Sequence, residues 1–373
     1  MATYTYFLAE LTTGRVVGEV ALAGFSGERN LAGDGAISAN LHLGALTGPA
    51  RQDAIDLTAP GRFSIVADRD GMPVGEWVIW KRTRANDSSP VGLFGKEFAS
   101  YLDRRQVETR SYAQVDQISI AESLVFGALQ SQSAGVVTAD VGGGALSGVP
   151  RDRVYLLGEA SVGQRLAELG QVLGGFDYQF TYTWQTLGGV RYIARRFQTS
   201  YPRAGFDRPM LFEQASPGQR GGNMLAFSLD EDATGLADQV FTIGASDANE
   251  VRLLGVAQSV ALTSQGYPFM QRARSWTDVS VAATINAKAR DLLAGSASAV
   301  LPPTMVVLAD GDPGLGEYQL GDRVRLQVGP SINFPVGYAT RVRILGWTVS
   351  PPAQGPELVT LTITDADDVP GDE

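Results

Sequence analysis

The sequence predicts a mainly β fold with α+β insertions, and three observations support this prediction. Gly accounts for 44 of the 373 residues, well above its usual share of about 7% and without the G-X-Y period of collagen, which indicates many tight turns. Apolar and polar residues alternate in segments at both ends of the chain, whereas the clearest helical patterns lie in the middle. The length indicates two or three domains.

Residues 1–108 are predicted to form the first domain, an antiparallel barrel or sandwich. The turn signals Thr13-Gly14 and Asp70-Gly71 each join two β-rich segments. A third segment alternates strictly, as expected of a half-buried strand. The predicted strands are Tyr4–Leu11, Val16–Leu22, Ile37–Leu43, Arg62–Asp68 and Gly75–Arg84.

Residues 109–215 are predicted to form an α+β domain with helices near 119–132 and 161–173. Each helix begins with a capping box, in which two side chains satisfy amides at the helix start. The boxes are Ser119 with Glu122 and Ser161 with Gln164, and Gly174-Gly175 is expected to end the second helix. The apolar faces are Ile120, Leu124, Ala128 and Leu129 in the first helix, and Val162, Leu166, Leu169 and Leu173 in the second.

A hairpin of Phe176–Thr183 and Val190–Phe197 is expected to follow the second helix. The stretch 198–223 is rich in Gly, Pro and Arg, and we interpret it as a passage between domains. Both features belong to the α+β domain or its boundary.

Residues 216–373 are predicted to form a second β domain with an inserted, helix-containing region at about 245–300. The inserted helix is expected over Asp278–Leu293, starting at Asp278 or Ser280, with Ile285, Ala289 and Leu292 facing inward. The acidic end, Asp365–Glu373, is expected to be a frayed tail. The predicted strands are Met224–Leu229, Ala237–Ile243, Met305–Leu308, Arg323–Val328, Thr340–Val349 and Leu358–Thr364.

Composition excludes several classes of function. The net charge of −10 argues against a dedicated nucleic-acid binder, which needs a basic surface. The absence of Cys excludes disulfides, thiol catalysis and cysteine metal sites. No apolar run reaches the roughly 18 residues of a membrane-spanning helix, and the N-terminus lacks the pattern of a signal peptide. We therefore expect folding in a cytoplasm.

Candidate catalytic and metal-binding residues are few, and each has a structural interpretation. His42, the single histidine, lies on the polar face of a strand, and no G-x-S-x-G nucleophile elbow accompanies it. One histidine and no cysteine cannot form a typical zinc site. The run from Asp310 to Gly314 departs from the spacing of a calcium loop and is expected to be an acidic turn.

The remaining candidates are glycines, tryptophans and carboxylates. Gly142, Gly143, Gly144 and Gly148 lack the G-K-[ST] ending of a phosphate loop. A glycosidase with two carboxylates stays formally open, because spacing in sequence says nothing about two groups that face a sugar. Core packing is expected for Trp77, Trp80, Trp184, Trp276 and Trp347. We therefore assign no catalytic, cofactor-binding or metal-binding residue and predict that the chain is not an enzyme.

Three stretches resemble minor tail, or tail-hub, proteins of long non-contractile-tailed phages of actinobacteria. GFSGERNLAGDGAISANLHLG (24–44) resembles their early strand–loop–strand, and SVGQRLAELGQVLGGFDYQF (161–180) resembles their helix followed by a "GFDY/F" strand. LGDRVRLQV (320–328) with RILGWTVSP (343–351) is similar to their closing β unit. Region 245–275 matches no part of the family.

The resemblance implies a baseplate-hub-like fold, with two β-barrel tube-type domains and smaller α+β domains. It implies a homotrimeric ring at the tail tip of the virion that closes the tail tube and forms part of the DNA-ejection conduit. The implied partners are the distal tail protein ring, the tape-measure protein and other minor tail or receptor-binding proteins, while DNA passes without specific binding. A glycan-binding module and a wall-degrading enzyme are the competing hypotheses. No interface residue is assigned.

Overall fold

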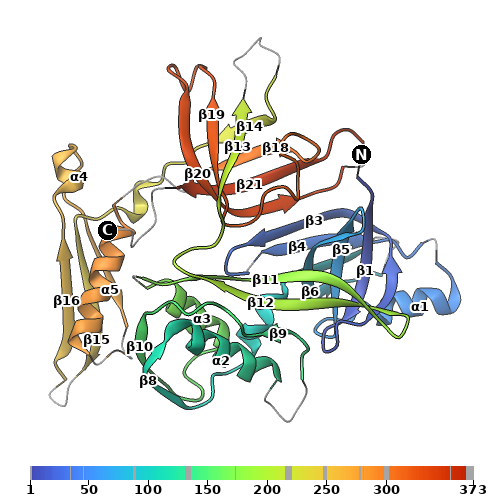
Figure 1. Cartoon of the computed structure of the whole chain (residues 1–373), viewed down its shortest axis with the longest axis horizontal. Coiled ribbons are helices and arrows are strands. Elements are labelled where there is room, and N and C mark those ends of the chain that lie inside the picture. Colours follow the sequence, from blue (N-terminus) through green and yellow to red (C-terminus); the bar gives the residue numbers. More distant parts are fainter. Residues whose placement is uncertain are drawn as a thin grey trace. The chain divides into compact units, whose positions relative to one another are not determined.

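The chain forms two compact units (Figure 1). The larger contains residues 1–171, 175–227 and 304–367, and the smaller consists mainly of residues 228–303. No helix in the described residues is long and apolar enough to cross a membrane. The computed structural model describes residues 2–33, 35–44, 46–86, 90–130, 136–172, 174–214, 221–246, 250–276, 279, 281–297, 302–352 and 354–366.

The N-terminal half-sheet has the strand order β2-β1-β5-β6-β7-β4-β3. Its strands are β1 (Tyr4–Glu10), β2 (Val16–Val20), β3 (Leu22–Asn30), β4 (Ala36–Leu41), β5 (Phe63–Arg69), β6 (Met72–Thr83) and β7 (Val91–Glu97). Only Ala21 separates β2 from β3, so one bent strand pairs first with β1 and then with β4. The half-sheet therefore curls back on itself in a barrel-like form.

The interior of the N-terminal half-sheet is apolar, as the alternating pattern predicts. Trp77, Ile65 and Leu93 are fully buried in it. Burial of each such side chain stabilises the fold by about 1.5–3 kcal/mol. The short helix α1 (Gly48–Asp56), between β4 and β5, contributes no buried residue.

The C-terminal half-sheet repeats this plan with β13 (Asp207–Gln214), β14 (Met224–Ser228), β18 (Thr304–Leu308), β19 (Arg323–Val328), β20 (Tyr338–Val349) and β21 (Leu358–Asp365). Phe212, Met305 and Ile344 are among its fully buried side chains. Strand β20 pairs with β3, so the two half-sheets form one continuous 13-stranded sheet.

The segment between the half-sheets is α+β and has its own core. It contains η1 (Phe98–Arg104), β8 (Arg110–Asp116), α2 (Gln117–Gln130), β9 (Asp140–Val141), β10 (Pro150–Tyr155), α3 (Val162–Gly170), β11 (Asp177–Leu187) and β12 (Val190–Ser200). The β11–β12 hairpin turns at Gly188 and Gly189, which both adopt positive φ. Its core joins Leu166 of α3 and Phe176 to Val66 and Val78 of the N-terminal half-sheet.

The smaller unit is a three-stranded sheet covered by a helix. It contains η2 (Ala233–Gly235), β15 (Gln239–Ser246), β16 (Arg252–Gln258), α4 (Ala261–Ser264), β17 (Gln271–Ser275) and α5 (Ala282–Ala294). Helix α5 packs Ala289 against Val240 of β15. The inserted helix is thus confirmed, and Ile285 and Ala289 face inward as expected. Its expected start residues, Asp278 and Ser280, lie outside the described residues, as does 367–373 of the acidic tail.

The predicted helix near 119–132 is confirmed as far as Gln130, since residues 131 and 132 lie outside the described residues, but its predicted capping box is wrong. Helix α2 begins at Gln117, so Ser119 and Glu122 lie inside it. The Asp116 carboxylate instead accepts a hydrogen bond from the Ile118 amide at 2.9 Å. The Asp116 carboxylate, just before the helix, therefore satisfies an amide of the first turn. The helix begins earlier than predicted.

The capping box of the second helix is confirmed. The Ser161 hydroxyl accepts from the Gln164 amide at 3.1 Å, and the Gln164 side chain accepts from the Ser161 amide at 3.0 Å. The helix ends at Gly170, earlier than the predicted end. Gly174 has φ of 67° but lies beyond the helix end, so it does not terminate α3, and Leu173 lies outside the described residues.

The stretch 198–223, interpreted as a passage between domains, contains strand residues in its described part, and residues 215–220 lie outside the described residues. Strand β12 continues to Ser200, and β13 pairs in parallel with β19. Pro209, which suggested a loop, lies where the β13–β19 register shifts between Asp207 and Leu211. A bulge tolerates proline because its missing amide is not needed for the ladder.

The two half-sheets repeat one topology that no sequence repeat reveals. The order β4-β7-β6-β5 recurs as β18-β21-β20-β19, and every pair is antiparallel. The flanking strands differ, because β1 is antiparallel to β5 whereas β13 is parallel to β19.

The repeat extends to individual residues. Strands β6 and β20 both have 12 residues. Against β7 the register of β6 shifts just after Ile79, and against β21 the register of β20 shifts just after Ile344. The Gly61 amide donates to the Ile79 carbonyl at 2.8 Å, and the Gly321 amide donates to the Ile344 carbonyl at 2.7 Å. Ile79 and Ile344 therefore occupy equivalent positions.

Candidate assembly site at the junction of the half-sheets

The junction is centred on the antiparallel pairing of β3 with β20. Gly27 lies opposite Val349, and Asn30 lies opposite Gly346. A Cβ atom on Gly346 would lie 2.0 Å from the Asn30 side-chain oxygen, so this close approach requires glycine. Beyond the pairing, the Ser26 and Ser350 hydroxyl oxygens are 2.9 Å apart. The backbone of the sheet is thus continuous across the junction.

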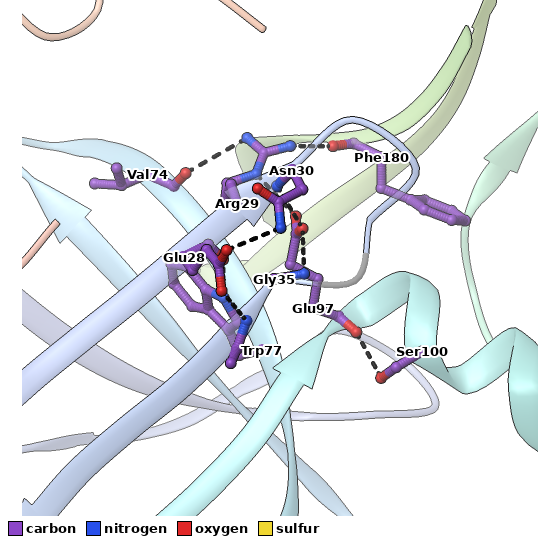
Figure 2. A network of polar contacts seen from close by, with 10 residues as sticks. Glu28, Arg29, Asn30, Gly35, Val74, Trp77, Glu97, Ser100 and Phe180 are labelled. Atoms are coloured by element: carbon purple, nitrogen blue, oxygen red, sulfur yellow. Dashed lines mark hydrogen bonds and ion pairs between the residues drawn. The ribbon is translucent and has the colours of Figure 1, made fainter. Parts of the chain in front are cut away.

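A buried ion pair supports the β3 side of the junction (Figure 2). The Glu97 carboxylate accepts from Arg29 Nε at 3.0 Å and from the amides of Asn30 at 3.0 Å and Gly35 at 3.2 Å. Arg29 also donates to the Phe180 carbonyl of β11 at 2.6 Å. One side chain thus ties β3 to β7 and to the α+β segment.

The chemistry of Glu97 is governed by its burial. Its side chain is 3% exposed, and that of Arg29 is 11% exposed. Burial raises the pKa of Glu97, while the Arg29 cation and the two amides oppose this rise. We therefore assign the Glu97 carboxylate a structural role, because its oxygens already accept hydrogen bonds from one cation and two backbone amides.

A second network links the two half-sheets through Glu357, which immediately precedes β21. Arg69 of β5 donates to both Glu357 oxygens, with Nη2 at 3.0 Å, and to Asp310 at 2.6 Å. The Tyr4 hydroxyl donates to Glu357 at 2.5 Å. Burial and the adjacent Glu357 carboxylate raise the pKa of Tyr4 well above its usual value. Asp310 thus serves as an ion-pair partner in an acidic turn.

A third network links the C-terminal half-sheet to β11. Asp177, at the start of β11, pairs with Arg343 of β20 and with Arg203 at 3.4 Å. Nearby, Asp322 accepts from Arg208 of β13 at 3.0 Å. Removing either partner of such a buried pair leaves an uncompensated charge, so these contacts fix how the parts of the larger unit meet.

The three parts line an open pocket of about 380 Å³. Its lining includes Arg29, Trp347 and the rings of Tyr182 and Tyr318. Arg29 lies 5.0 Å from the Tyr182 ring centroid and 5.8 Å from that of Trp347. Within the described residues, the Tyr182 and Tyr318 hydroxyls have no hydrogen-bond partner. Burial raises the pKa of both phenols, so the hydroxyls stay neutral.

The other candidate residues are dispersed over the chain. His42 is exposed and follows the end of β4, so its interpretation as a surface residue is confirmed and the predicted strand is slightly too long. Gly144 donates its amide to Glu122 at 2.8 Å. Among the described residues, no group of three or more His, Asp or Glu side chains could hold a metal ion.

Four of the five tryptophans pack against the hydrophobic cores as predicted, whereas half-buried Trp276 lies in none of the core clusters of the described residues, and its predicted core packing is wrong. Trp77 is fully buried and Trp347 is 7% exposed. The indole nitrogens of Trp80 and Trp184 donate to Ser100 and Asp68. Trp276 lies 5.0 Å from both Arg274 and Lys288. Each indole is therefore engaged by neighbouring protein groups.

Fold comparison gives the clearest relationship to known proteins. No protein-family model matches this chain, and no curated protein matches its sequence. The tail protein from Neisseria meningitidis superposes with a TM-score of 0.62 at 13% identity, covering 98% of both chains. The 43 kDa tail protein of prophage MuSo2 from Shewanella oneidensis also gives 0.62, at 12% identity over 98% of this chain and 99% of that one.

A prophage tail protein from Listeria monocytogenes gives a TM-score of 0.50 at 12% identity, covering 97% of this chain and 95% of that one. Identities this low establish similarity of fold. The predicted mainly β class with α+β insertions is confirmed, and over nearly its whole length this chain has the fold of phage tail proteins.

Proposed function

We propose that this chain is a structural hub of a phage tail tip, three copies of which form a ring that closes the tail tube. The repeated topology of the half-sheets is the observation that carries this proposal. A ring of three chains presents six similar half-sheets, which allows a threefold hub to meet a sixfold tube. The fold shared with tail proteins supports the same assignment.

The junction supplies the rigidity that such a ring needs. Buried ion pairs and a continuous sheet hold the half-sheets at one angle. Because six half-sheets must close around an axis, a flexible hinge between them would permit open chains as well as rings. The ion-pair networks of Glu97, Glu357 and Asp177 thus restrict movement between the half-sheets.

The charge of the chain suits a conduit for DNA. Three chains of net charge −10 carry about −30 in the ring. Such a surface repels phosphates, so DNA passes without being held. We further propose that the ring contacts the distal tail protein ring, the tape-measure protein and other minor tail or receptor-binding proteins, in a phage with a long non-contractile tail that infects actinobacteria.

The competing functions have less support. A glycan-binding module built on tryptophan rings would need free indoles, but those of Trp77, Trp184 and Trp347 are buried or engaged. A wall-degrading enzyme would need two facing carboxylates free to react, whereas Glu97 and Glu357 are committed to arginines.

Counting copies in purified tail tips tests the proposal. Native mass spectrometry of tips released from virions should give three copies of this chain for each tip. A copy number that is not a multiple of three would contradict a hub. Binding to host cell walls by the isolated chain, or clearing of wall suspensions, would favour the glycan-binding or enzymatic alternative.

A further inference from the structure

We propose that copies of this chain join through two complementary sheet edges, the basic end of β6 and the acidic segment after β14. The inference rests on the proposed ring and names the surface that closes it. Its starting point is the junction inside one chain, where β3 fills an edge of β20 that is open in the equivalent strand β6.

The open edge follows from the repeat. Strand β20 pairs with β19 as far as Arg343, and the same edge then takes up β3 at Gly346–Val349. Strand β6 pairs with β5 as far as Val78, followed by the Gly61–Ile79 hydrogen bond. Beyond that point, no strand of the described residues pairs with this edge of β6. Since Ile79 matches Ile344, Lys81–Arg84 matches the part of β20 that receives β3.

The complementary edge follows in the same way. Strand β14 flanks β18 as β3 flanks β4, and in the described residues β18 is its only strand neighbour in the sheet order. The Leu308 amide donates to the Asn223 carbonyl at 3.1 Å, which places the start of β14 opposite the end of β18. The end of β3, Gly27–Asn30, pairs with β20 on the edge opposite β4, and Gly27 takes part in both pairings. In chain order, its counterpart is the segment that directly follows β14, residues 229–232.

The two edges carry opposite charges. The β6 edge has the sequence Lys81-Arg82-Thr83-Arg84, in which Arg82 is half-buried and the others are exposed. The segment after β14 has the sequence Leu229-Asp230-Glu231-Asp232, in which the three acidic residues are exposed. Antiparallel pairing of these edges sets cations opposite carboxylates, whereas two copies of either edge would repel each other.

Existing contacts hold these side chains without neutralising them. Arg82 donates to the Thr58 hydroxyl at 3.0 Å and to the Ile55 carbonyl near the end of α1. Lys81 Nζ lies 5.6 Å from the Phe94 ring centroid. Hydrogen bonds from the Thr234 side chain and from its amide, the latter at 2.8 Å, lower the pKa of Asp232 and keep the carboxylate charged at neutral pH.

The pairing is head-to-tail. Each chain contributes the β6 edge to one contact and residues 229–232 to another, so each copy contacts two others through different surfaces. A heterologous contact of this kind closes into a ring when its rotation permits. The internal β3–β20 junction provides the geometric template for that rotation.

Disulfide trapping tests the proposal, because the chain contains no cysteine. A full-length Lys81→Cys variant is mixed in turn with Asp230→Cys, Glu231→Cys or Asp232→Cys, and each mixture is oxidised mildly. The three acidic-segment variants together cover the possible registers of pairing. The matched control replaces the acidic-segment variant with Ile332→Cys, a 97% exposed position outside both Lys81–Arg84 and residues 229–232. The double variant Ser26→Cys/Ser350→Cys, at the internal junction, is the positive control for disulfide formation.

We expect at least one Lys81 pair to crosslink about tenfold faster than the Ile332 pair, and the advantage to shrink as salt screens the charges. Equal rates for all pairs, alongside a formed Ser26–Ser350 disulfide, would overturn the inference. If tail tips contain three copies but no specific crosslink forms, the proposed contact surface is wrong, while the proposed hub is not contradicted. A specific crosslink with a copy number other than a multiple of three would instead contradict the proposed hub.

Discussion

Arg29→Met should destabilise the larger unit strongly, because it leaves the Glu97 carboxylate buried without its cation. Glu97 would keep the amides of Asn30 and Gly35 but lose Arg29 Nε at 3.0 Å. Breaking a buried pair by removing one partner costs about 3–5 kcal/mol. The lost hydrogen bond to the Phe180 carbonyl acts in the same direction.

The cost should depend on pH with a defined sign. Burial raises the pKa of Glu97 in the native protein, and removal of Arg29 should raise it further. The folded variant would then bind a proton that the unfolded chain, with a carboxyl pKa of about 4.3, does not bind near neutral pH. Lowering the pH from 8 towards 5 should therefore recover stability by up to about 1.4 kcal/mol per pH unit.

Urea unfolding followed by tryptophan fluorescence at pH 8 and pH 5.5 measures both effects. Arg341→Met is the matched control, because Arg341 pairs with Asp207 at 2.5 Å but the two side chains are 52% and 63% exposed. An exposed pair contributes about 0–1 kcal/mol. If the two variants unfold at the same urea concentration at both pH values, the reasoning about the Glu97 network is refuted.

Three further outcomes are expected. Gly346→Ala should lower the thermal midpoint, because the added carbon crowds Asn30 and destabilises the fold by about 1–3 kcal/mol. Gly44→Ala should be nearly neutral, because no atom lies within 4 Å of the added carbon. Equal effects of the two substitutions would contradict the close approach at Gly346. Leu166→Asp should lower the free energy of unfolding by about 4–5 kcal/mol and give insoluble protein. The control variant Leu166→Met should stay folded. An unchanged melting temperature of the Leu166→Asp variant would show that this face of α3 is not buried. EDTA should leave the melting temperature unchanged, and a shift of several degrees would reveal a bound metal.

The regular elements were predictable where burial is periodic. Alternation located β4 and β19 because every second side chain of each strand is buried. The capping box located the start of α3 because both partners are close in sequence. Helix α1 was missed although Gly48-Pro49 opens it, because it buries no residue and thus has no apolar period.

The junction could not be predicted from the sequence. Glu97 lies 68 residues from Arg29, and Glu357 lies 288 residues from Arg69, so no local pattern connects the partners. The repeated topology was equally hidden, because strand order depends on backbone pairing and requires only suitable apolar positions, as at Ile79 and Ile344.

A cryo-electron microscopy reconstruction of the intact tail tip tests the central claim most directly. The account predicts three copies of this chain around the tail axis, with their N-terminal and C-terminal half-sheets alternating as six similar lobes. It also predicts Lys81–Arg84 of each copy beside residues 229–232 of the next. Density for this chain on peripheral spikes, away from the axis, would contradict the account.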